Sequence, residues 1–482
     1  MNYKLVIRSL GVILLIEAAA MAPSLLVSLL TGDGQWAALV WSMALLCATG
    51  FPAWRLSRPE ENNLRAREGF LTVALAWILM SFFGALPFVF SGMIPSLTDA
   101  FFETVSGFTT TGATVLTVFE GQPKGIMFWR SFTHWVGGMG VLVLSLIFLP
   151  KISGRTSHLV RAESPGPTLS KIVPKMSDTA KILYLVYTVL TLLQFVCLLL
   201  TGLSPYDAAI HALGTAGTGG FSNYGGSVGE MNNPAAEAVI TVFMLVFSVN
   251  LALYFRIIRG EWREAIRSEE LRWFLCIVAA VMLLVTLSIW PEYGNFFTAL
   301  RHGSFQVASI VSTSGFATAD FNLWTPVAKI LLLLLMFCGA CVGSTGGGLK
   351  ISRVAMLVKY ARREVRHVFQ PRKVQVIRFE GKGVDDALLS QTAIYFFVYM
   401  AITLLGALLV SLEGSFDLET NLTAAITCAN NVGPGFGAVG PMGNFSGYSM
   451  FSKLVLSMLM LAGRLEFYPI LVLFSPVIWR KN

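Results

Sequence analysis

The sequence predicts an all-α integral membrane protein, in which two leading transmembrane helices precede four pseudo-symmetric repeats around one pore. Three observations predict this fold. Of the 482 residues, 55% are hydrophobic and only 13% are charged, and a soluble domain needs more charge to cover its surface. Long apolar segments alternate with segments that are too short to cross a bilayer. A run of small residues around a glycine occurs four times, at a period of roughly 100 residues.

The first two apolar segments, residues 5–29 and 36–56, predict spanning helices joined by a short turn at Thr31–Gly34. The first is too long for the apolar region of a cleavable signal peptide, so we expect it to remain as a helix. This pair lacks the later pattern and predicts a leading two-helix domain at residues 1–65. An isolated charge in such a helix is costly, so we expect Glu17 to have a structural partner.

Each repeat is predicted to contain a spanning helix, a short re-entrant pore helix, a polar loop and a second spanning helix. A span needs about 20 residues to cross about 30 Å of hydrocarbon, and the pore-helix segments are shorter. We assign the repeats to residues 66–152, 153–262, 263–383 and 384–482. The predicted first span, pore helix and second span are 69–91, 100–108 and 128–149; 181–202, 207–217 and 235–258; 272–290, 296–312 and 327–358; and 388–412, 417–430 and 450–475.

The basic residues are distributed unevenly between the two sides of the predicted membrane. Most of the 35 Lys and Arg lie at the termini or in alternate loops, and the richest stretch runs from Lys350 to Lys382. This positive-inside asymmetry predicts that both termini are cytoplasmic. A nucleic-acid surface would not follow the alternation of loops, so the net charge of +8 does not indicate a nucleic-acid partner. The opposite loops carry acids such as Glu103 and Glu120, which would concentrate cations there.

The four glycine runs indicate a selectivity filter for a monovalent cation. Backbone carbonyls can replace the hydration shell of an ion where the chain is extended, and glycine permits the backbone angles required. Hydroxyl groups can add oxygens or brace the loop. Non-helical backbone at membrane depth also has to be surrounded by protein or by a water-filled cavity. The predicted filter residues are Thr110, Thr111, Gly112, Thr218, Gly219, Gly220, Thr313, Ser314, Gly315, Asn431, Val432 and Gly433.

Other chemistries are not indicated. The six cysteines are scattered through apolar segments, and the five histidines show no metal-ligand spacing, so we expect no disulfide and no metal apart from the transported ion. No nucleophile, base and metal set converges, which disfavours an enzyme. The alternative function is a 12-helix secondary carrier for another cation or small solute, which predicts paired large repeats with broken spanning helices. A purely structural membrane scaffold would leave the four matched loops unexplained.

Three motifs together resemble the TrkH/TrkG family, the membrane subunits of bacterial Trk potassium uptake systems. They are Thr109–Thr114, Gly339–Lys350 and Asn430–Gly435, and the resemblance runs essentially end to end. Related Ktr and plant HKT transporters share the four-repeat plan but usually lack the leading pair. The resemblance implies potassium translocation across the bacterial inner membrane, by a channel or by ion-coupled symport. It also implies a homodimer with one pore in each protomer, and control by a cytosolic TrkA-type nucleotide-binding ring.

In that family a serine at the first filter glycine accompanies sodium selectivity. Here the position is Gly112, which favours potassium. No covalently bound cofactor is expected, and the nucleotide is expected on the partner subunit. The tandem glycines Gly219 and Gly220 leave the register of the second loop open by one residue.

Two features suggest a gate below the filter. Small residues interrupt the second span of the third repeat, and either close helix packing or an intramembrane gate loop would explain them, the latter favoured by the resemblance. Arg464 lies inside the final span, where it either pairs with a carboxylate or a helix end, or forms a positive barrier in the pore. The predicted gate residues are Gly339, Gly343, Ser344, Thr345, Gly346, Gly347, Gly348 and Arg464. The basic loop that follows either binds anionic headgroups or docks the cytosolic regulator.

Overall fold

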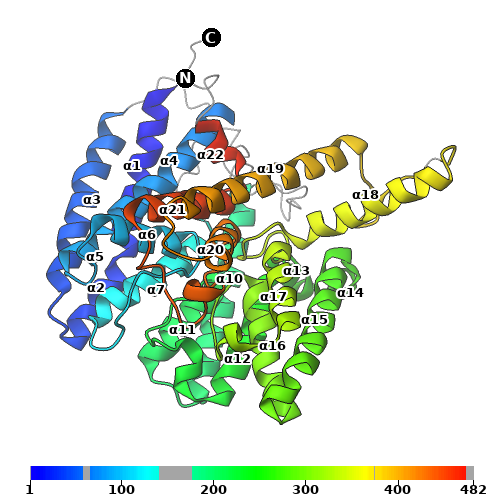
Figure 1. The fold of residues 1–482 in the computed structure, drawn as a ribbon. Helices are drawn as coiled ribbons and strands as arrows, with labels where there is room; N and C mark the ends of the chain where they lie inside the picture. The colour runs from blue at the N-terminus through cyan, green and yellow to red at the C-terminus, as the bar shows by residue number, and fades with distance from the viewer. Residues whose placement is uncertain (1, 58–65, 141–175, 374, 474–482) are drawn as a thin grey trace.

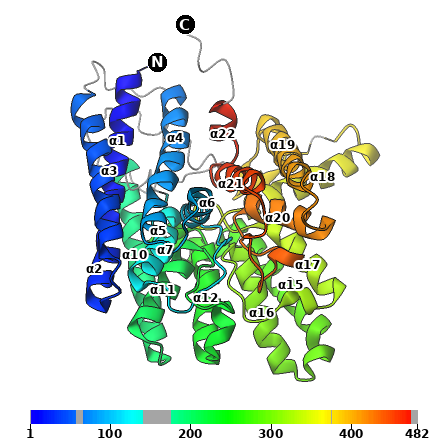
Figure 2. The same ribbon diagram turned by 60° about the vertical axis from the view of Figure 1, so that its left-hand side comes forward.

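The computed structural model describes residues 2–57, 66–140, 176–373 and 375–473. Its fold is the predicted one, almost entirely helical. The leading pair consists of α1 (Tyr3–Ala20), which continues into α2 (Ala22–Thr31), and α3 (Trp36–Leu56). This pair lies at one edge of the molecule, with α15 and α16 at the opposite edge (Figures 1 and 2). A Cβ atom on Gly11 would lie 2.7 Å from the carbonyl oxygen of Gly50, so small residues permit close packing of α1 on α3.

Six described helical segments are long and apolar enough to cross a membrane. Two are the leading pair, Tyr3–Thr31 and Trp36–Leu56, and the other four are the first spans of the repeats: Glu68–Phe90, Asp178–Leu200, Glu269–Tyr293 and Asp386–Ser411. These four correspond to α4 (Ala66–Gly84) with α5 (Leu86–Phe90), α10 (Met176–Leu200), α15 (Glu269–Tyr293) and α19 (Asp386–Ser411).

The four pore helices are α6 (Leu97–Phe108), α11 (Pro205–Gly217), α16 (Phe296–Ser312) and α20 (Leu418–Asn430). Each begins at a capping side chain, respectively that of Ser96, Ser204, Asn295 and Asp417, which accepts a hydrogen bond from a backbone N–H of the first turn. Such caps satisfy donors that the helix leaves unpaired. Hydrogen bonds from Thr420 hold the pKa of Asp417 below its usual range.

The second spans differ from the prediction, because those of the second, third and fourth repeats are interrupted, while that of the first is described only as far as Gly140. They are formed by α7 (Lys124–Gly138); α12 (Pro234–Ser248) and α13 (Leu251–Ile258); α17 (Pro326–Cys338) and α18 (Ile351–Phe369); and α21 (Met450–Arg464) and α22 (Tyr468–Leu473). The prediction of continuous spans at 235–258 and 450–475 is therefore wrong, whereas the interruption after 338 was predicted. Residues 141–149 and 474–475 lie outside the described residues.

The backbone explains each break. Between α12 and α13, Val249 is extended and Asn250 caps the new helix, which turns by 91°. After α21, Glu466 and Phe467 both have positive φ angles, which are incompatible with an α-helix. Gly140 has a φ of 68° just after α7. Broken spans are also a feature of carriers, but here they occur in the second, third and fourth units among the described residues.

The remaining elements are short. They are α14 (Trp262–Arg267), the 3-10 helices η1 (Ser227–Met231), η2 (Phe321–Leu323) and η3 (Gly437–Val439), and strands β1 (Arg378–Phe379) and β2 (Lys382–Gly383). The strands form an antiparallel hairpin after α18. The basic stretch from Lys350 is therefore mostly a helix, which projects from the body of the molecule beside α19 (Figure 1).

One expectation about the leading pair is wrong. Glu17 is only 3% exposed, yet neither of its carboxylate oxygens has a hydrogen-bond partner among the described residues. It lies against Gly84 of α4, where an added Cβ atom would be 2.9 Å from Oε1 of Glu17.

Candidate functional site

The four pore helices end in the same backbone turn. In each, one residue adopts the left-handed conformation, with φ of 58° at Thr110, 55° at Thr218, 61° at Thr313 and 56° at Asn431. The N–H of the next residue then returns to a carbonyl in the last helical turn, as in the bond of 2.9 Å from Thr111 to Ser106. The equivalent bonds join Gly219 to Gly214, Ser314 to Ser309 and Val432 to Thr427. This pattern is the Schellman motif, which redirects the chain sharply at a helix end.

This turn sets the register of the four loops. In each repeat the filter glycine lies two positions after the left-handed residue, which gives Gly112, Gly220, Gly315 and Gly433. The second loop therefore aligns at Gly220. Gly219 has a separate reason to be glycine, because a Cβ atom there would overlap the ring of His134.

The four glycines close a ring. A Cβ atom built on Gly112 would lie 2.7 Å from the nitrogen of Gly220, and one on Gly220 would lie 2.9 Å from the carbonyl carbon of Gly315. One on Gly315 would overlap the carbonyl oxygen of Val432, and one on Gly433 would lie 2.6 Å from the carbonyl oxygen of Thr111. No side chain fits between the loops, so only backbone faces the axis at this level.

Hydroxyl and amide groups brace the ring from behind. Nδ2 of Asn431 donates to the hydroxyl of Thr111 at 3.0 Å, and Thr111 also contacts the hydroxyl of Thr109 at 2.8 Å. The hydroxyl groups of Ser312 and Ser314 are 2.8 Å apart. Every predicted filter residue from Thr110 to Val432 that has a polar side chain is fully buried, so these groups hold the loops in place.

A cavity of about 290 Å³ lies against one side of the ring and is lined by all four filter glycines, together with Thr114, Ser222, Tyr224 and Asn444. Its lining includes hydroxyl and amide groups that can replace part of the water around a cation. The C-terminal ends of the four pore helices converge on the ring, and their dipoles favour positive charge there. A partly dehydrated cation is thus the ligand that this geometry suits.

On the opposite side of the ring lies the inner loop, which we define as residues 339–350 between α17 and α18. The N–H of Gly347 donates to the hydroxyl of Thr313 at 2.7 Å. Cβ atoms on Gly346 and Gly347 would approach the carbonyl oxygens of Ser312 and Asn430 to 2.9 and 2.5 Å. The inner loop therefore packs directly against the ends of the third and fourth pore helices, and several of its glycines are needed for that approach.

The inner loop is also fixed to the break in the second repeat. The N–H of Cys341 donates to the carbonyl of Ser248 at 3.0 Å, and the carbonyl of Gly343 accepts from Leu251 at 3.0 Å. Gly339, Gly343 and Gly348 have positive φ angles. Thr345 is buried, while Ser344 is partly exposed and donates to the carbonyl of Cys341.

Arg464 connects the filter, the inner loop and α7. Its Nη1 donates to the hydroxyl of Thr110 at 3.1 Å and to the carbonyl of Thr345 at 2.8 Å, and its Nη2 donates to the carbonyls of Gly137 and Gly138 at 2.6 and 2.8 Å. The predicted helix-end contact and the predicted position beside the inner loop therefore occur together. The positive charge lies immediately below the ring.

Sequence reasoning missed three residues beside the ring. Glu103 was counted among the acids at the pore mouth, but it is fully buried and pairs with Arg130 at 2.7 Å. His134 lies one turn further along α7, with Nδ1 2.8 Å from the carbonyl oxygen of Gly107. The detectable signal was the position of charged residues inside two membrane-embedded helices, where an unpaired charge is costly.

Comparison with known proteins agrees with this architecture. Residues 37–481 match the family model TrkH, described as a cation transport protein. The chain is 35% identical to the Trk system potassium uptake protein TrkH of Salmonella typhimurium, over the whole of both chains. It is 32% identical to the Escherichia coli protein TrkG, covering 100% of this chain and 99% of that one.

A solved structure is also similar. The crystal structure of the potassium transporter TrkH from Vibrio parahaemolyticus matches with a TM-score of 0.90 and 32% identity, covering all of both chains. The relatives are named as transport proteins and not as enzymes. Since the family model spans most of the chain and several relatives match at full length, this protein belongs to the TrkH family of cation transport proteins.

Proposed function

We propose that this protein takes up potassium ions across the bacterial inner membrane, through one pore in each chain. The observation that carries the proposal is the ring of Gly112, Gly220, Gly315 and Gly433, which leaves no space for a side chain between neighbouring loops. Carbonyl oxygens presented in this way suit a monovalent cation. Relatives that match at full length are named potassium uptake proteins, and the absence of serine at position 112 favours potassium over sodium. A homodimer would then contain two separate pores.

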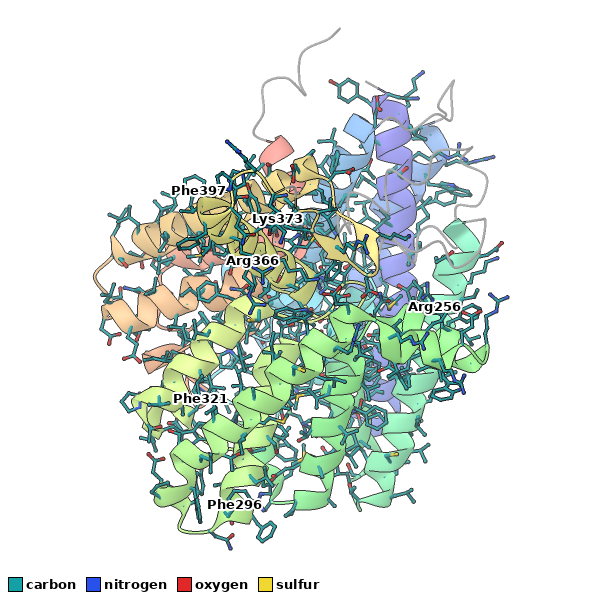
Figure 3. The ribbon with its side chains drawn as sticks, turned by 90° about the vertical axis from the view of Figure 1, so that its right-hand side faces the viewer. Arg256, Phe296, Phe321, Arg366, Lys373 and Phe397 are labelled. Atoms are coloured by element: carbon teal, nitrogen blue, oxygen red, sulfur yellow. The ribbon has the colours of Figure 1, made fainter. Side chains whose placement is uncertain are left out.

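We place the cytoplasm on the side of the inner loop. The basic residues Arg366 and Lys373 lie at the opposite end of the molecule from Phe296 (Figure 3), and basic loops remain inside. The start of α1 lies near the same end as α22 (Figure 1), so both termini would be cytoplasmic. The cavity beside Thr114 and Asn444 would then be the external entrance.

The inner loop and Arg464 would together form the gate. An arginine just below the ring of filter loops repels a cation that leaves the filter, and the inner loop occupies the same region. Arg464 donates to the carbonyl of Thr345 in the inner loop and to the carbonyls of Gly137 and Gly138 in α7. Movement of the loop would remove the Thr345 contact and leave the guanidinium held by α7 and Thr110 alone.

A cytosolic nucleotide-binding subunit would act on this gate through α18. This helix follows the inner loop directly at Lys350 and extends away from the body (Figure 1). Lys359 and Arg363 are engaged by Glu269 and Asp386, whereas Arg362 and Arg366 are exposed. Val368 and Phe369 are 78% and 80% exposed. A partner that binds this end could pull on the inner loop, and the nucleotide would be held by that partner.

Flux measurements in liposomes test the proposal. The native chain should pass potassium in preference to sodium. Gly112→Ser would place its Cβ atom 2.7 Å from the nitrogen of Gly220, so it should lower total flux and also reduce the potassium-to-sodium ratio of the remaining flux by about tenfold, or about 1.4 kcal/mol. Gly92→Ser is the matched control, because Gly92 also has a positive φ of 73° but has no atom within 4 Å of an added Cβ. If the potassium-to-sodium flux ratio of Gly112→Ser equals that of the native chain, Gly112 is not part of a selectivity filter.

A further inference from the structure

One position in the pore helices has a different residue in each repeat. Glu103 lies on the first pore helix, and the residues at the same distance before the other filter glycines are His211, Gln306 and Ala424. Only the first repeat therefore places an acid behind its filter loop. His211 reaches the hydroxyl of Ser222 in its own loop at 3.0 Å, but Ala424 has no group that can do this.

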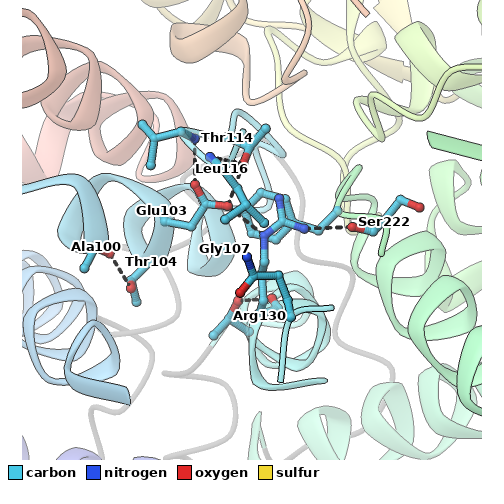
Figure 4. A network of polar contacts seen from close by, with 12 residues as sticks. Ala100, Glu103, Thr104, Gly107, Thr114, Leu116, Arg130 and Ser222 are labelled. Carbon is cyan, nitrogen blue, oxygen red and sulfur yellow. Dashed lines mark hydrogen bonds and ion pairs between the residues drawn. The ribbon is translucent and has the colours of Figure 1, made fainter. Parts of the chain in front are cut away.

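Glu103 fixes the chain that leaves the first filter glycine. Its Oε1 accepts from the hydroxyl of Thr114 at 2.8 Å, and its Oε2 accepts from the N–H of Val115 at 2.8 Å. Oε1 also accepts from Nε of Arg130 at 2.7 Å. Figure 4 shows these contacts converging on one carboxylate. Glu103 is 0% exposed and Arg130 is 1% exposed, so the ion pair is buried, although Arg130 and Thr114 also line the cavity beside the ring.

Arg130 carries the connection to the second loop. Its Nη1 donates to the carbonyl oxygen of Ser222 at 2.9 Å (Figure 4). Its guanidinium also lies 3.6 Å from the centre of the Phe221 ring, a geometry that cation–π attraction favours. Phe221 and Ser222 directly follow Gly220, so Arg130 contacts the second loop immediately after its filter glycine.

His134 makes a second connection between the same two segments. A carbonyl can only accept, so Nδ1 carries the proton that is donated to Gly107 on the first pore helix, at 2.8 Å. Nε2 is then an acceptor, and it receives the N–H of Phe221 at 3.3 Å. This places a neutral imidazole between the end of α6 and the second loop. Arg130 and His134 are one helical turn apart, so they share a face of α7.

We propose that Glu103, Arg130 and His134 form a clamp that sets the spacing between the first and second filter loops and thereby determines ion selectivity. The three residues are positioning residues, because they contact loop backbone and not the ion. Removing a partner from a buried charged pair is strongly destabilising locally, and the adjoining backbone would respond by relaxing. A relaxed loop would discriminate less between potassium and the smaller sodium ion. The inference rests on the proposed potassium filter and assigns part of its selectivity to residues outside the ring.

The test measures potassium and sodium flux of the full-length protein in liposomes, separating selectivity from total uptake. Glu103→Gln removes the charge but keeps an oxygen for Val115, and His134→Phe keeps the ring shape but removes both hydrogen bonds. Arg130→Lys keeps the ion pair but loses the forked contact with Ser222. The control is Glu237→Gln, the same change in a buried acid that pairs with Arg301 at 3.2 Å away from the ring.

We expect Glu103→Gln and His134→Phe to lower the potassium-to-sodium ratio by about tenfold, which corresponds to about 1.4 kcal/mol, while potassium uptake persists. Arg130→Lys should give a smaller fall, and Glu237→Gln should match the native chain. Should the first two variants not fold, as judged by size-exclusion chromatography, Arg130→Lys decides the question. A native ratio in every folded clamp variant would overturn the clamp. If the ratio then still falls in Gly112→Ser, the filter assignment stands and the clamp alone fails.

Discussion

The two halves of the pore are built differently. On the outer side, four segments with different sequences end in one backbone turn, so that Thr110, Thr218, Thr313 and Asn431 share nearly the same left-handed angle. On the inner side, the described second spans are interrupted in different ways, by extended backbone at Val249, by a loop after Cys338 and by positive φ angles at Glu466 and Phe467. The outer half repeats a geometry because each loop contributes to one ring. The inner half does not have to form such a ring, and among the described residues the third repeat inserts a loop there.

The largest effect should come from a substitution that blocks the ring of filter glycines. Gly315→Ala would place a methyl group onto the carbonyl oxygen of Val432 and 2.7 Å from Cδ of Pro434. We expect potassium flux in liposomes to be abolished. Gly414→Ala is the control, because Gly414 has a similar φ of 66° but no atom within 4 Å of an added Cβ. Normal flux in Gly315→Ala would mean that the ring is not the narrow part of the pore.

The second effect concerns the inner half. Arg464→Ala removes the charge below the ring and the bonds to Thr110 and Thr345. We expect potassium flux without any partner to rise by about tenfold, which corresponds to a barrier lowered by about 1.4 kcal/mol. Arg464→Lys retains the charge, so its basal potassium flux should rise less. Equal basal flux in all three proteins would exclude Arg464 from gating.

A smaller effect should come from the bond that joins the two halves. Thr313→Val is nearly isosteric but removes the hydroxyl that accepts from Gly347. Loss of one such hydrogen bond costs about 1 kcal/mol, so basal flux should rise about fivefold. Thr313→Ser keeps the hydroxyl and should resemble the native chain. If Thr313→Val and Thr313→Ser have the same basal potassium flux, this hydrogen bond does not hold the inner loop.

The smallest effect is expected at the start of a pore helix. Asp417→Ala removes the cap of α20 and should cost about 1 kcal/mol of stability, seen as a lower melting temperature in detergent. Asp417→Asn retains a capping oxygen and serves as control. Hydrogen bonds lower the pKa of Asp417 in the folded protein. The extra stability of the native chain over Asp417→Ala is therefore fully present above the pKa of an aspartate in the unfolded chain, about 3.9. It should disappear as pH falls through the folded pKa, and an advantage that persists in acid would contradict this account.

Sequence reasoning predicted the outer half better than the inner half. The first spans and pore helices follow from hydropathy and length, and the filter glycines from their spacing. The breaks at Val249 and Glu466 were missed because hydropathy does not report backbone angles. The pairing of Glu103 with Arg130 was missed because it depends on how two helices pack.

The closing contact of the ring joins the beginning of the chain to its end. Nδ2 of Asn431 binds the hydroxyl of Thr111, and the N–H of Phe445 donates to the carbonyl oxygen of Thr114 at 2.8 Å. Contacts so distant in sequence form late, because a long loop must be closed first. The first three repeats emerge from the ribosome before the residues that complete the passage. The ring therefore cannot be complete in a chain that is still being synthesised, before Gly433 has been added.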